Sequence, residues 1–244
     1  IEECNVPVFH DDQHGTAIII AAGLLNALEI QGKSLAEAVI VCVGAGAAGI
    51  ASMRLLVALG AKKDNMFLLD SNGIIHSERQ DLNPYKFAFS RTTDKRSLED
   101  ALDGADVFIG VARPKLLSPS LLKLMAAKPI IFALSNPEPE ILPEDAKLAR
   151  DDLIIATGRS DYPNQVNNVL CFPYIFRGAL DVRATCINQS MQMAAVEAIR
   201  SLAKLEVAEE VKASYPKQQD WTFGENYILP KPTDPRLRES VSSA

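Results

Sequence analysis

The stretch AVIVCVGAGAAGIASMRLLVALG, residues 38–60, decides the fold of this chain. It opens with a short β-branched run that predicts a buried strand, and it closes with a helix whose apolar residues share one face. Between them, Gly44, Gly46 and Gly49 have GxGxxG spacing. These glycines would allow a tight turn, a close approach of the backbone to a pyrophosphate, and tight packing of helix against strand. Because the N-terminus of the helix would offer amide donors to phosphates, the stretch predicts a dinucleotide-binding turn.

The rest of the chain supplies the context that this turn requires. The run MFLLD predicts a second strand that ends at Asp70, where an acidic residue usually hydrogen-bonds the adenosine ribose. Glycines also serve plain turns, but this context favours dinucleotide binding. Further strands are predicted at 106–110, in KPIIFALSNP and in DDLIIATG, with helices at 16–30, after a Ser118 cap, and over 175–203. Strands that alternate with helices pair in parallel, so we expect an α/β fold: a Rossmann-like doubly wound parallel sheet with helices on both faces.

Composition excludes several classes of function. The chain has 244 residues and a formal net charge of −6, and no basic cluster stands out, so no nucleic-acid partner is expected. The most apolar segment, 17–30, is too short and too polar to span a bilayer, so no membrane partner is expected. The four cysteines, Cys4, Cys42, Cys171 and Cys186, have no CxxC spacing, and we expect them to be buried thiols of a cytoplasmic protein.

Two polar turns follow predicted strands. ALSNP contains Ser135 and Asn136, and ATGRSDYPNQVNN contains Asn167 and Asn168. Taken singly, each turn is explained by the ordinary preference of Asn and Ser for turns and caps. Ligands of such sheets bind beyond the carboxyl ends of the strands, and both turns fall at that edge. Together they therefore indicate a binding site.

The segment VFHDDQHGTA, residues 8–17, resembles the zinc signature HExxH in having His10 and His14 four residues apart. Asp11 is shorter than the Glu of that signature. Gly15 directly follows His14, at a position where a helix that carries zinc ligands should continue, so we do not expect a zinc peptidase. Paired carboxylates suit Mg²⁺ or Mn²⁺ better. The alternative is an Asp that caps the helix starting near residue 16, and one residue could do both. His10 and His14 are not expected to be metal ligands.

FHDDQHGTA, GAGAAG, FALSNPEPEI and GRSDYPNQVNN, in this order, resemble the nicotinamide-cofactor domain of malic enzyme. The best match is the bacterial type in which a phosphotransacetylase-like domain follows. The resemblance covers nearly the whole chain and ends with FGENYILPKPTDPRL. It implies NAD(P)-dependent oxidative decarboxylation of (S)-malate to pyruvate and CO₂, with Mg²⁺ or Mn²⁺ as Lewis acid.

The resemblance also implies residue roles. Asp12 matches the metal ligand, and Asp11 its neighbour close to the catalytic lysine. The residues that contact malate match Asn136, Asn167 and Asn168, of which Asn136 also contacts the cofactor. The cofactor-binding set matches Gly44, Ala45, Gly46, Ala47, Ala48, Gly49, Asp70 and Ser71.

One departure from the family is large. Its catalytic tyrosine and lysine and its Glu-Asp metal pair belong to a segment that would precede Ile1, and the chain lacks an initiator Met. We therefore expect a cofactor-binding part that is inactive alone. Its expected partners are malate or pyruvate, the N-terminal catalytic segment, the phosphotransacetylase-like domain and further copies of itself. The expected division is a metal-site turn at 1–16, a dinucleotide-binding domain at 17–204 and an irregular extension at 205–244.

The choice between NAD and NADP rests on conflicting signals. An acidic residue such as Asp70 usually favours NAD. The family keeps an aspartate here in NADP users too, so the resemblance favours NADP. Arg79, Lys86 and Arg91 could bind a 2′-phosphate or could form a solvated basic face. Two other functions stay open: another Rossmann-fold dehydrogenase of the amino-acid dehydrogenase type, with a catalytic lysine and no metal, and a non-catalytic nucleotide-sensing module.

Overall fold

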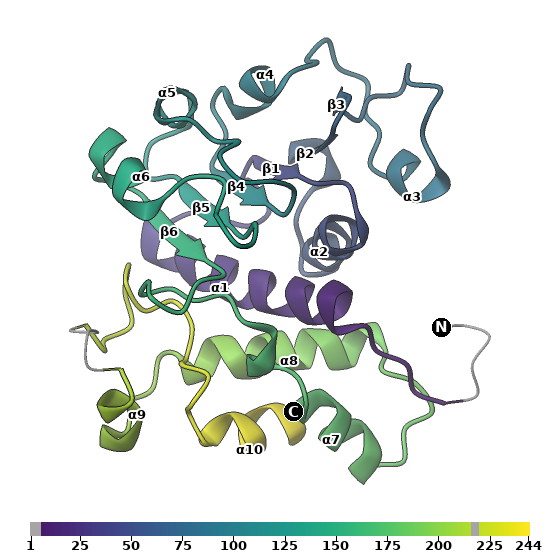
Figure 1. Ribbon diagram of the computed structural model, residues 1–244. Helices are drawn as coiled ribbons and strands as arrows, with labels where there is room; N and C mark the ends of the chain where they lie inside the picture. The colour runs from purple at the N-terminus through teal and green to yellow at the C-terminus, as the bar shows by residue number, and fades with distance from the viewer. Residues whose placement is uncertain (1–5, 216–219) are drawn as a thin grey trace.

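The computed structural model, which describes residues 6–215 and 220–244, contains a sheet of six strands (Figure 1). The strands are β1 (Ile40–Val43), β2 (Met66–Asp70), β3 (Gly73–Ile74), β4 (Val107–Gly110), β5 (Ile130–Ala133) and β6 (Ile154–Thr157). Their order in the sheet is β3-β2-β1-β4-β5-β6. All neighbours pair in parallel except β2 and β3, which are antiparallel because a tight turn, not a crossover helix, joins them. The predicted parallel sheet is thus confirmed, with one antiparallel edge strand.

Helices surround this sheet. They are α1 (Thr16–Gln31), α2 (Ala47–Ala58), α3 (Pro84–Phe87), α4 (Leu98–Leu102), α5 (Pro119–Leu122), α6 (Pro143–Ala149), α7 (Tyr174–Asp181), α8 (Gln189–Leu202), α9 (Glu209–Ala213) and α10 (Arg236–Ser242). Three short turns complete them: the π-helical η1 (Asp11–Gly15) and the 3₁₀ turns η2 (Lys63–Asn65) and η3 (Asn168–Leu170).

The parallel strands β1, β4, β5 and β6 bury both of their faces, as is typical of parallel sheets covered by helices. Along β1, Ile40 and Cys42 join the core that includes α1 and α2, whereas Val41 and Val43 join the core under α4, α5 and α6. The sheet is therefore doubly wound, with helices on both faces as predicted. Ser118 caps α5 as expected, because its Oγ accepts a hydrogen bond of 3.3 Å from the Leu121 N–H.

A further layer lies on the far side of α1. There α7, α8 and α10 pack together, so that α1 runs between the sheet and this helical layer (Figure 1). Since α1 meets protein around most of its circumference, it is largely apolar, and Ile18, Ile19 and Ile20 are fully buried. The most apolar segment of the chain is thus a central core helix.

The C-terminal third departs from expectation in two places. The helix predicted over 175–203 is interrupted between α7 and α8, where Arg183 adopts a φ of 52° and Asn188 starts a new helix by capping the Met191 N–H. The segment 205–244, predicted as irregular, includes α9 and α10 among its described residues. The sequence pattern over 236–242 is too short to predict a helix, and α10 is stabilised by packing on α7 and α8.

The cysteines of the described segments are free thiols. Cys42 and Cys171 are buried as expected, but Cys186 is exposed, so the expectation of burial was wrong for that residue. Cys4 lies outside the described residues. Over residues 6–215 and 220–244, no helix has both the length and the apolar character needed to cross a membrane.

Asn26 on α1 gives a test of how α1 is held. It is fully buried, and its Nδ2 donates to the carbonyl oxygens of Arg200 (3.0 Å) and Ile228 (2.9 Å). Asn26→Leu would leave both acceptors without this donor, so we expect the free energy of unfolding to fall by about 2–4 kcal/mol. Chemical denaturation measures this, with the exposed Gln80→Leu as a control expected to change it by less than about 0.5 kcal/mol. Equal effects of the two changes would contradict the role assigned to Asn26.

Candidate functional site

The glycine turn joins β1 to α2 at the carboxyl edge of the sheet. Gly44 has a φ of 119°, and a Cβ there would lie 2.7 Å from the carbonyl oxygen of Val111, which follows β4. A Cβ at Gly49 would overlap the carbonyl oxygen of Gly44. At Gly46, by contrast, a Cβ would meet no atom within 4 Å. The three glycines thus occupy a tight turn, an open approach and a close packing contact, as their spacing predicts.

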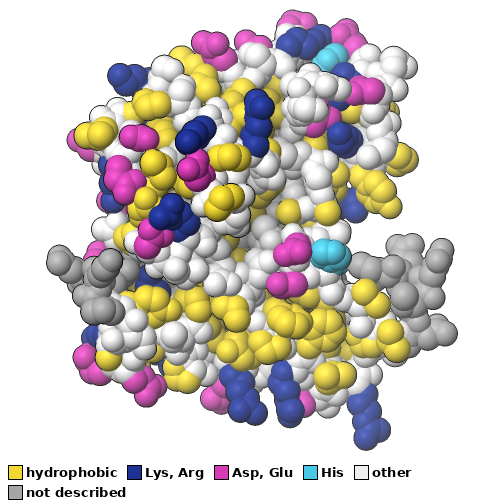
Figure 2. Space-filling model, viewed as in Figure 1, with side chains coloured by type: hydrophobic (Ala, Val, Ile, Leu, Met, Phe, Trp, Pro, Cys, Tyr) yellow, Lys and Arg dark blue, Asp and Glu magenta, His cyan; other side chains and the backbone are white. Residues whose placement is uncertain are grey.

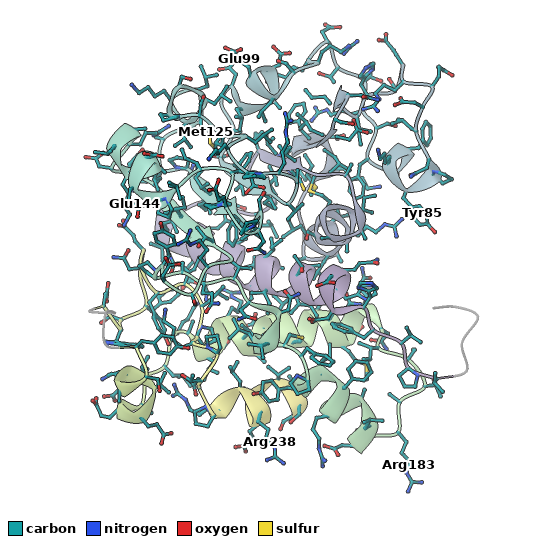
Figure 3. The ribbon with its side chains drawn as sticks, in the orientation of Figure 1. Tyr85, Glu99, Met125, Glu144, Arg183 and Arg238 are labelled. Carbon is teal, nitrogen blue, oxygen red and sulfur yellow. The ribbon has the colours of Figure 1, made fainter. Side chains whose placement is uncertain are left out.

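A cavity of about 970 Å³ opens beside this turn, and Ala45, Gly46 and Ala47 form part of its wall. No side chain caps the N-terminus of α2, where Gly46 is the N-cap residue. The first amides of α2 are therefore available to an anion, which the helix dipole also favours. Arg54 of α2 lies 5.3 Å from the ring centre of Tyr85 on α3, and both line the same cavity; Tyr85 is labelled in Figure 3.

Asp70, at the end of β2, is engaged by two cations. Arg79 donates to both of its carboxylate oxygens at 2.8 and 3.0 Å, and the Nζ of Lys86 donates to Oδ2 at 2.6 Å. The Asn72 N–H adds a bond of 2.9 Å, and Arg79 also binds Asp81. Burial alone would raise the pKa of Asp70, but these hydrogen bonds lower it to about 2. Asp70 is therefore a saturated acceptor between two positive charges.

Two further residues that the sequence associates with the cofactor, Ser71 and Arg91, make no hydrogen bond to Asp70 among the contacts of the described residues. Ser71, predicted to contact the cofactor, lies exposed in the turn after β2. Arg91, which sequence grouped with Arg79 and Lys86, does not join them: its guanidinium lies 4.2 Å above the ring of Phe67. Only two of the three predicted cations thus converge on Asp70.

The DD segment forms η1, directly before α1. His10 has extended backbone and precedes this turn, so His10 and His14 do not share a helical face as in HExxH. Instead the His10 N–H donates to Nδ1 of His14 at 3.2 Å, and burial lowers the pKa of His14. Neither Asp11 nor Asp12 caps α1, whose N-cap residue is Gly15, so the capping interpretation is wrong. The helical turn begins earlier than the pattern indicates.

The two carboxylates of η1 face different surroundings. Asp12 is exposed, whereas the Asp11 Oδ1 is buried without a hydrogen-bond partner among the described residues. Burial raises the pKa of Asp11. Within the described residues no group of three or more His, Cys, Asp or Glu side chains is placed to hold a metal ion. In Figure 2, acidic and histidine side chains gather beside the start of α1, at the edge of the hollow between sheet and helical layer.

Asn168 connects η3 to this turn. Its Nδ2 donates to the Asp11 carbonyl oxygen at 3.1 Å, and its Oδ1 accepts from Thr16 Oγ1 at 3.2 Å. Asn167 has a local role, since its Oδ1 accepts from the Val169 N–H at 3.1 Å. The structure therefore brings Asn168 and Asp11 together, although they are distant in sequence.

Asn136 lies beyond β5 and is exposed. A Cβ at Gly158, just beyond β6, would lie 3.4 Å from the Asn136 Oδ1. The two polar turns predicted from sequence therefore meet at one edge of the sheet.

Glu140 is a buried residue that the sequence did not reveal. It is fully buried and accepts hydrogen bonds from the Ala112 N–H (3.3 Å) and from the N–H and Oγ of Ser135 (3.1 and 2.8 Å). Burial raises its pKa. Its carboxyl group fills the space that a Cβ at Gly110 would need. Glu140 thus fixes the ends of β4 and β5, while nearby Glu138 is exposed and pairs with solvent-facing Lys115.

A glycine turn at the point where strand order reverses, with polar turns at the same edge, defines a nicotinamide-dinucleotide-binding domain. The family model for the malic enzyme NAD binding domain matches residues 13–221. The chain belongs to this family of malic enzyme domains, as the resemblance of its motifs predicted, and it is an NAD(P)-binding domain.

Known relatives extend beyond this chain. An NADP-dependent malic enzyme of Halomonas elongata is 59% identical over 244 residues, which are 100% of this chain and 58% of that protein. The crystal structure of Entamoeba histolytica malic enzyme superposes with a TM-score of 0.87 at 36% identity, covering 99% of this chain and 49% of its own. An NAD-dependent malic enzyme of Thermotoga maritima gives 0.85 at 41% identity, covering 99% and 60%. The chain thus spans about half the length of these proteins.

The unequal surroundings of Gly46 and Gly49 separate binding from folding. Gly46→Ala has room for its Cβ but places it on the wall of the cavity, so we expect normal thermal stability and at least about tenfold weaker NADPH binding. Gly49→Ala would push α2 away from the Gly44 carbonyl and should lower the free energy of unfolding by more than about 3 kcal/mol. Fluorescence titration with NADPH and thermal denaturation check both expectations. Equal loss of stability in the two variants would contradict this assignment.

Proposed function

We propose that this chain is the cofactor-binding part of an enzyme that oxidises (S)-malate with NADP and decarboxylates the product to pyruvate and CO₂. The observation that carries the proposal is the link between Asn168 and Asp11, which sets the DD turn beside the polar turns at the carboxyl edge of the sheet. A dinucleotide on the glycine turn would reach this edge. Malate-dependent reduction of NADP by the complete protein tests the proposal, and absence of turnover with either cofactor and added metal would refute it.

The chain's residues would bind and orient the reactants. The pyrophosphate would be held by the backbone of the glycine turn, which consists of Gly44, Ala45, Gly46, Ala47, Ala48 and Gly49. Asp70 and Ser71 would lie toward the adenosine ribose. Asn136 would contact the nicotinamide and malate, and Asn167 and Asn168 would contact malate. A nicotinamide cofactor held by these residues would supply the hydride acceptor for the oxidation of malate.

NADP is proposed over NAD because of the cluster around Asp70. Its carboxylate already accepts from Arg79, Lys86 and the Asn72 N–H, so it is poorly placed to accept a ribose hydroxyl as well. Arg79 and Lys86 are the donors that a 2′-phosphate prefers. The NADP-dependent Halomonas relative agrees with this choice, whereas the Thermotoga relative uses NAD.

We further propose that Asp12 supplies one oxygen ligand to Mg²⁺ or Mn²⁺. Its exposed carboxylate suits a hard cation, but the described residues form no complete metal group, so further ligands would come from elsewhere in the protein. A divalent cation bound there polarises the substrate carbonyl as a Lewis acid. Asp11 would lie behind Asp12, and by the family resemblance its carboxyl group would be close to the lysine of the N-terminal catalytic segment.

The remaining partners are proposals of the same kind. An N-terminal catalytic segment that carries the tyrosine and lysine, and a C-terminal phosphotransacetylase-like domain, would complete the protein, which would act as a homo-oligomer in the cytoplasm. The free thiols of Cys42 and Cys171 fit a reducing compartment. Membership of the malic enzyme family sets aside the amino-acid dehydrogenase alternative. A non-catalytic nucleotide-sensing module remains the second candidate, since it would need only the glycine turn.

Lys86 tests the cofactor preference. Lys86→Ala removes one cation from Asp70 and should weaken NADPH binding about 10- to 100-fold, the effect of one charge-assisted hydrogen bond, while NADH binding changes less than about threefold. Fluorescence titration with each cofactor measures both affinities. Lys62→Ala, which removes an exposed lysine outside the cluster, is the control. A parallel loss for NADH would mean that Lys86 supports the fold and does not read the phosphate.

Asp12 tests the metal proposal. In the complete protein, Asp12→Ala should lower malate turnover by at least about 100-fold and weaken Mn²⁺ binding, because an oxygen ligand is lost, while the dissociation constant for NADPH stays within about twofold. Steady-state kinetics, Mn²⁺ electron paramagnetic resonance and fluorescence titration give the three readouts. Asp81→Ala, an exposed aspartate near the ribose end, is the control for metal binding. Unchanged turnover in Asp12→Ala would favour the sensing module.

A further inference from the structure

Lys231 is a buried lysine whose ammonium group has no acidic partner in the part of the chain that the structure describes. Its side chain belongs to the buried segment that follows Tyr227 and is 3% exposed. Its Nζ donates a hydrogen bond of 2.6 Å to the carbonyl oxygen of Pro163 and lies 5.3 Å from the ring centre of Tyr215. Among the described residues, no carboxylate oxygen lies within 4.0 Å of it. Burial lowers its pKa to about 8.

An ammonium group buried in this way costs free energy that an apolar side chain of similar length would avoid. Within the described chain, the hydrogen-bond acceptor of the Lys231 ammonium group is the Pro163 carbonyl oxygen. This hydrogen bond is the contact that an apolar side chain at position 231 could not make. A bond from a charged donor is stronger and shorter than a neutral one. Lys231 is therefore a fixed anchor for the backbone at Pro163.

Pro163 belongs to the loop 158–168, which runs from the end of β6 to Asn167 and Asn168. The next residue, Asn164, is 3% exposed and is held from the same side. Its Nδ2 donates to the carbonyl oxygens of Glu225 (2.7 Å) and Ile155 (3.1 Å), and its Oδ1 accepts from the Ile228 N–H (3.2 Å). The C-terminal segment 225–231 thus holds the middle of the loop at two consecutive residues.

The far end of this loop is held by the candidate site. Val166 N–H donates to the Thr157 carbonyl oxygen at 2.8 Å, and Asn168 binds the Asp11 carbonyl oxygen. Between the anchor at Pro163 and the link at Asn168 there are only a few residues, so a shift at Pro163 is passed along a short, hydrogen-bonded backbone.

We propose that Lys231 is a positioning residue of the substrate site: by holding the Pro163 carbonyl, it sets the place of the loop that carries Asn167 and Asn168. The proposal rests on the proposed function, in which these asparagines contact malate. Lys231 touches neither the glycine turn nor the cluster around Asp70, so its effect is on malate and not on the dinucleotide.

The test uses Lys231→Met in the complete protein, since Met has similar length and no donor. We expect the KM for malate to rise about tenfold, with kcat changed less than about threefold and the dissociation constant for NADPH within about twofold. Lys231→Gln keeps an N–H donor without the charge and should raise the KM less. Lys123→Met, at an exposed lysine on the opposite face of the sheet, is the control. Parallel changes in KM and NADPH binding, or equal effects of Met and Gln, would overturn the proposal.

Hydrogen exchange supplies a readout that does not depend on turnover. In Lys231→Met, amides of 158–168 should exchange about tenfold faster, while those of 40–58 keep their wild-type rates. If the wild-type protein does not oxidise malate, the proposed function fails, and the loop measurement still decides whether Lys231 positions the loop. Unchanged exchange over 158–168 would refute the role of Lys231. Should Lys231→Met fail to fold, the same two measurements on Lys231→Gln decide it.

Discussion

The absence of a side chain at Gly49 is the constraint on which the rest of the binding edge depends. A Cβ there would overlap the Gly44 carbonyl oxygen, so only glycine lets α2 start directly above the end of β1. Gly44 in turn lies against Val111, which brings the ends of β1 and β4 together at the point where strand order reverses. The N-terminus of α2 therefore points to this place because of backbone packing, and no charged side chain is needed to direct it.

The second element of the architecture is α1. It lies between the sheet and the layer of α7, α8 and α10 and joins them (Figure 1), and its entry turn η1 reaches the binding edge. Gly15 makes this possible, since a Cβ there would occupy the space of the Asp11 carboxylate. A helix in the core thus fixes the backbone of the turn that carries both acidic residues.

Local patterns were sufficient for much of this fold. The β-branched run of β1, the apolar run of β2, the glycine spacing and the Ser118 cap were all predicted correctly, because each depends on neighbours in sequence. The interruption between α7 and α8 and the π-helical start at η1 were missed, because tertiary packing decides where those helices begin. The exposed Cys186 shows the same limit for burial. Glu140 and Glu138 look alike in sequence, and only the fold buries the first.

Asp70 shows how tertiary contacts can change the meaning of a correctly predicted residue. The rule that an acidic residue here selects NAD assumes a carboxylate with free lone pairs. Arg79 and Lys86, which lie later in the chain, occupy them, and Asp81 balances the second positive charge from an exposed position. A ribose hydroxyl would have to compete with charged donors for Asp70, which is unfavourable. A 2′-phosphate would instead compete with exposed Asp81 for Arg79, which is a replacement of one anion by a more highly charged one. The proposed preference for NADP thus rests on the cluster of four charges and not on the aspartate alone.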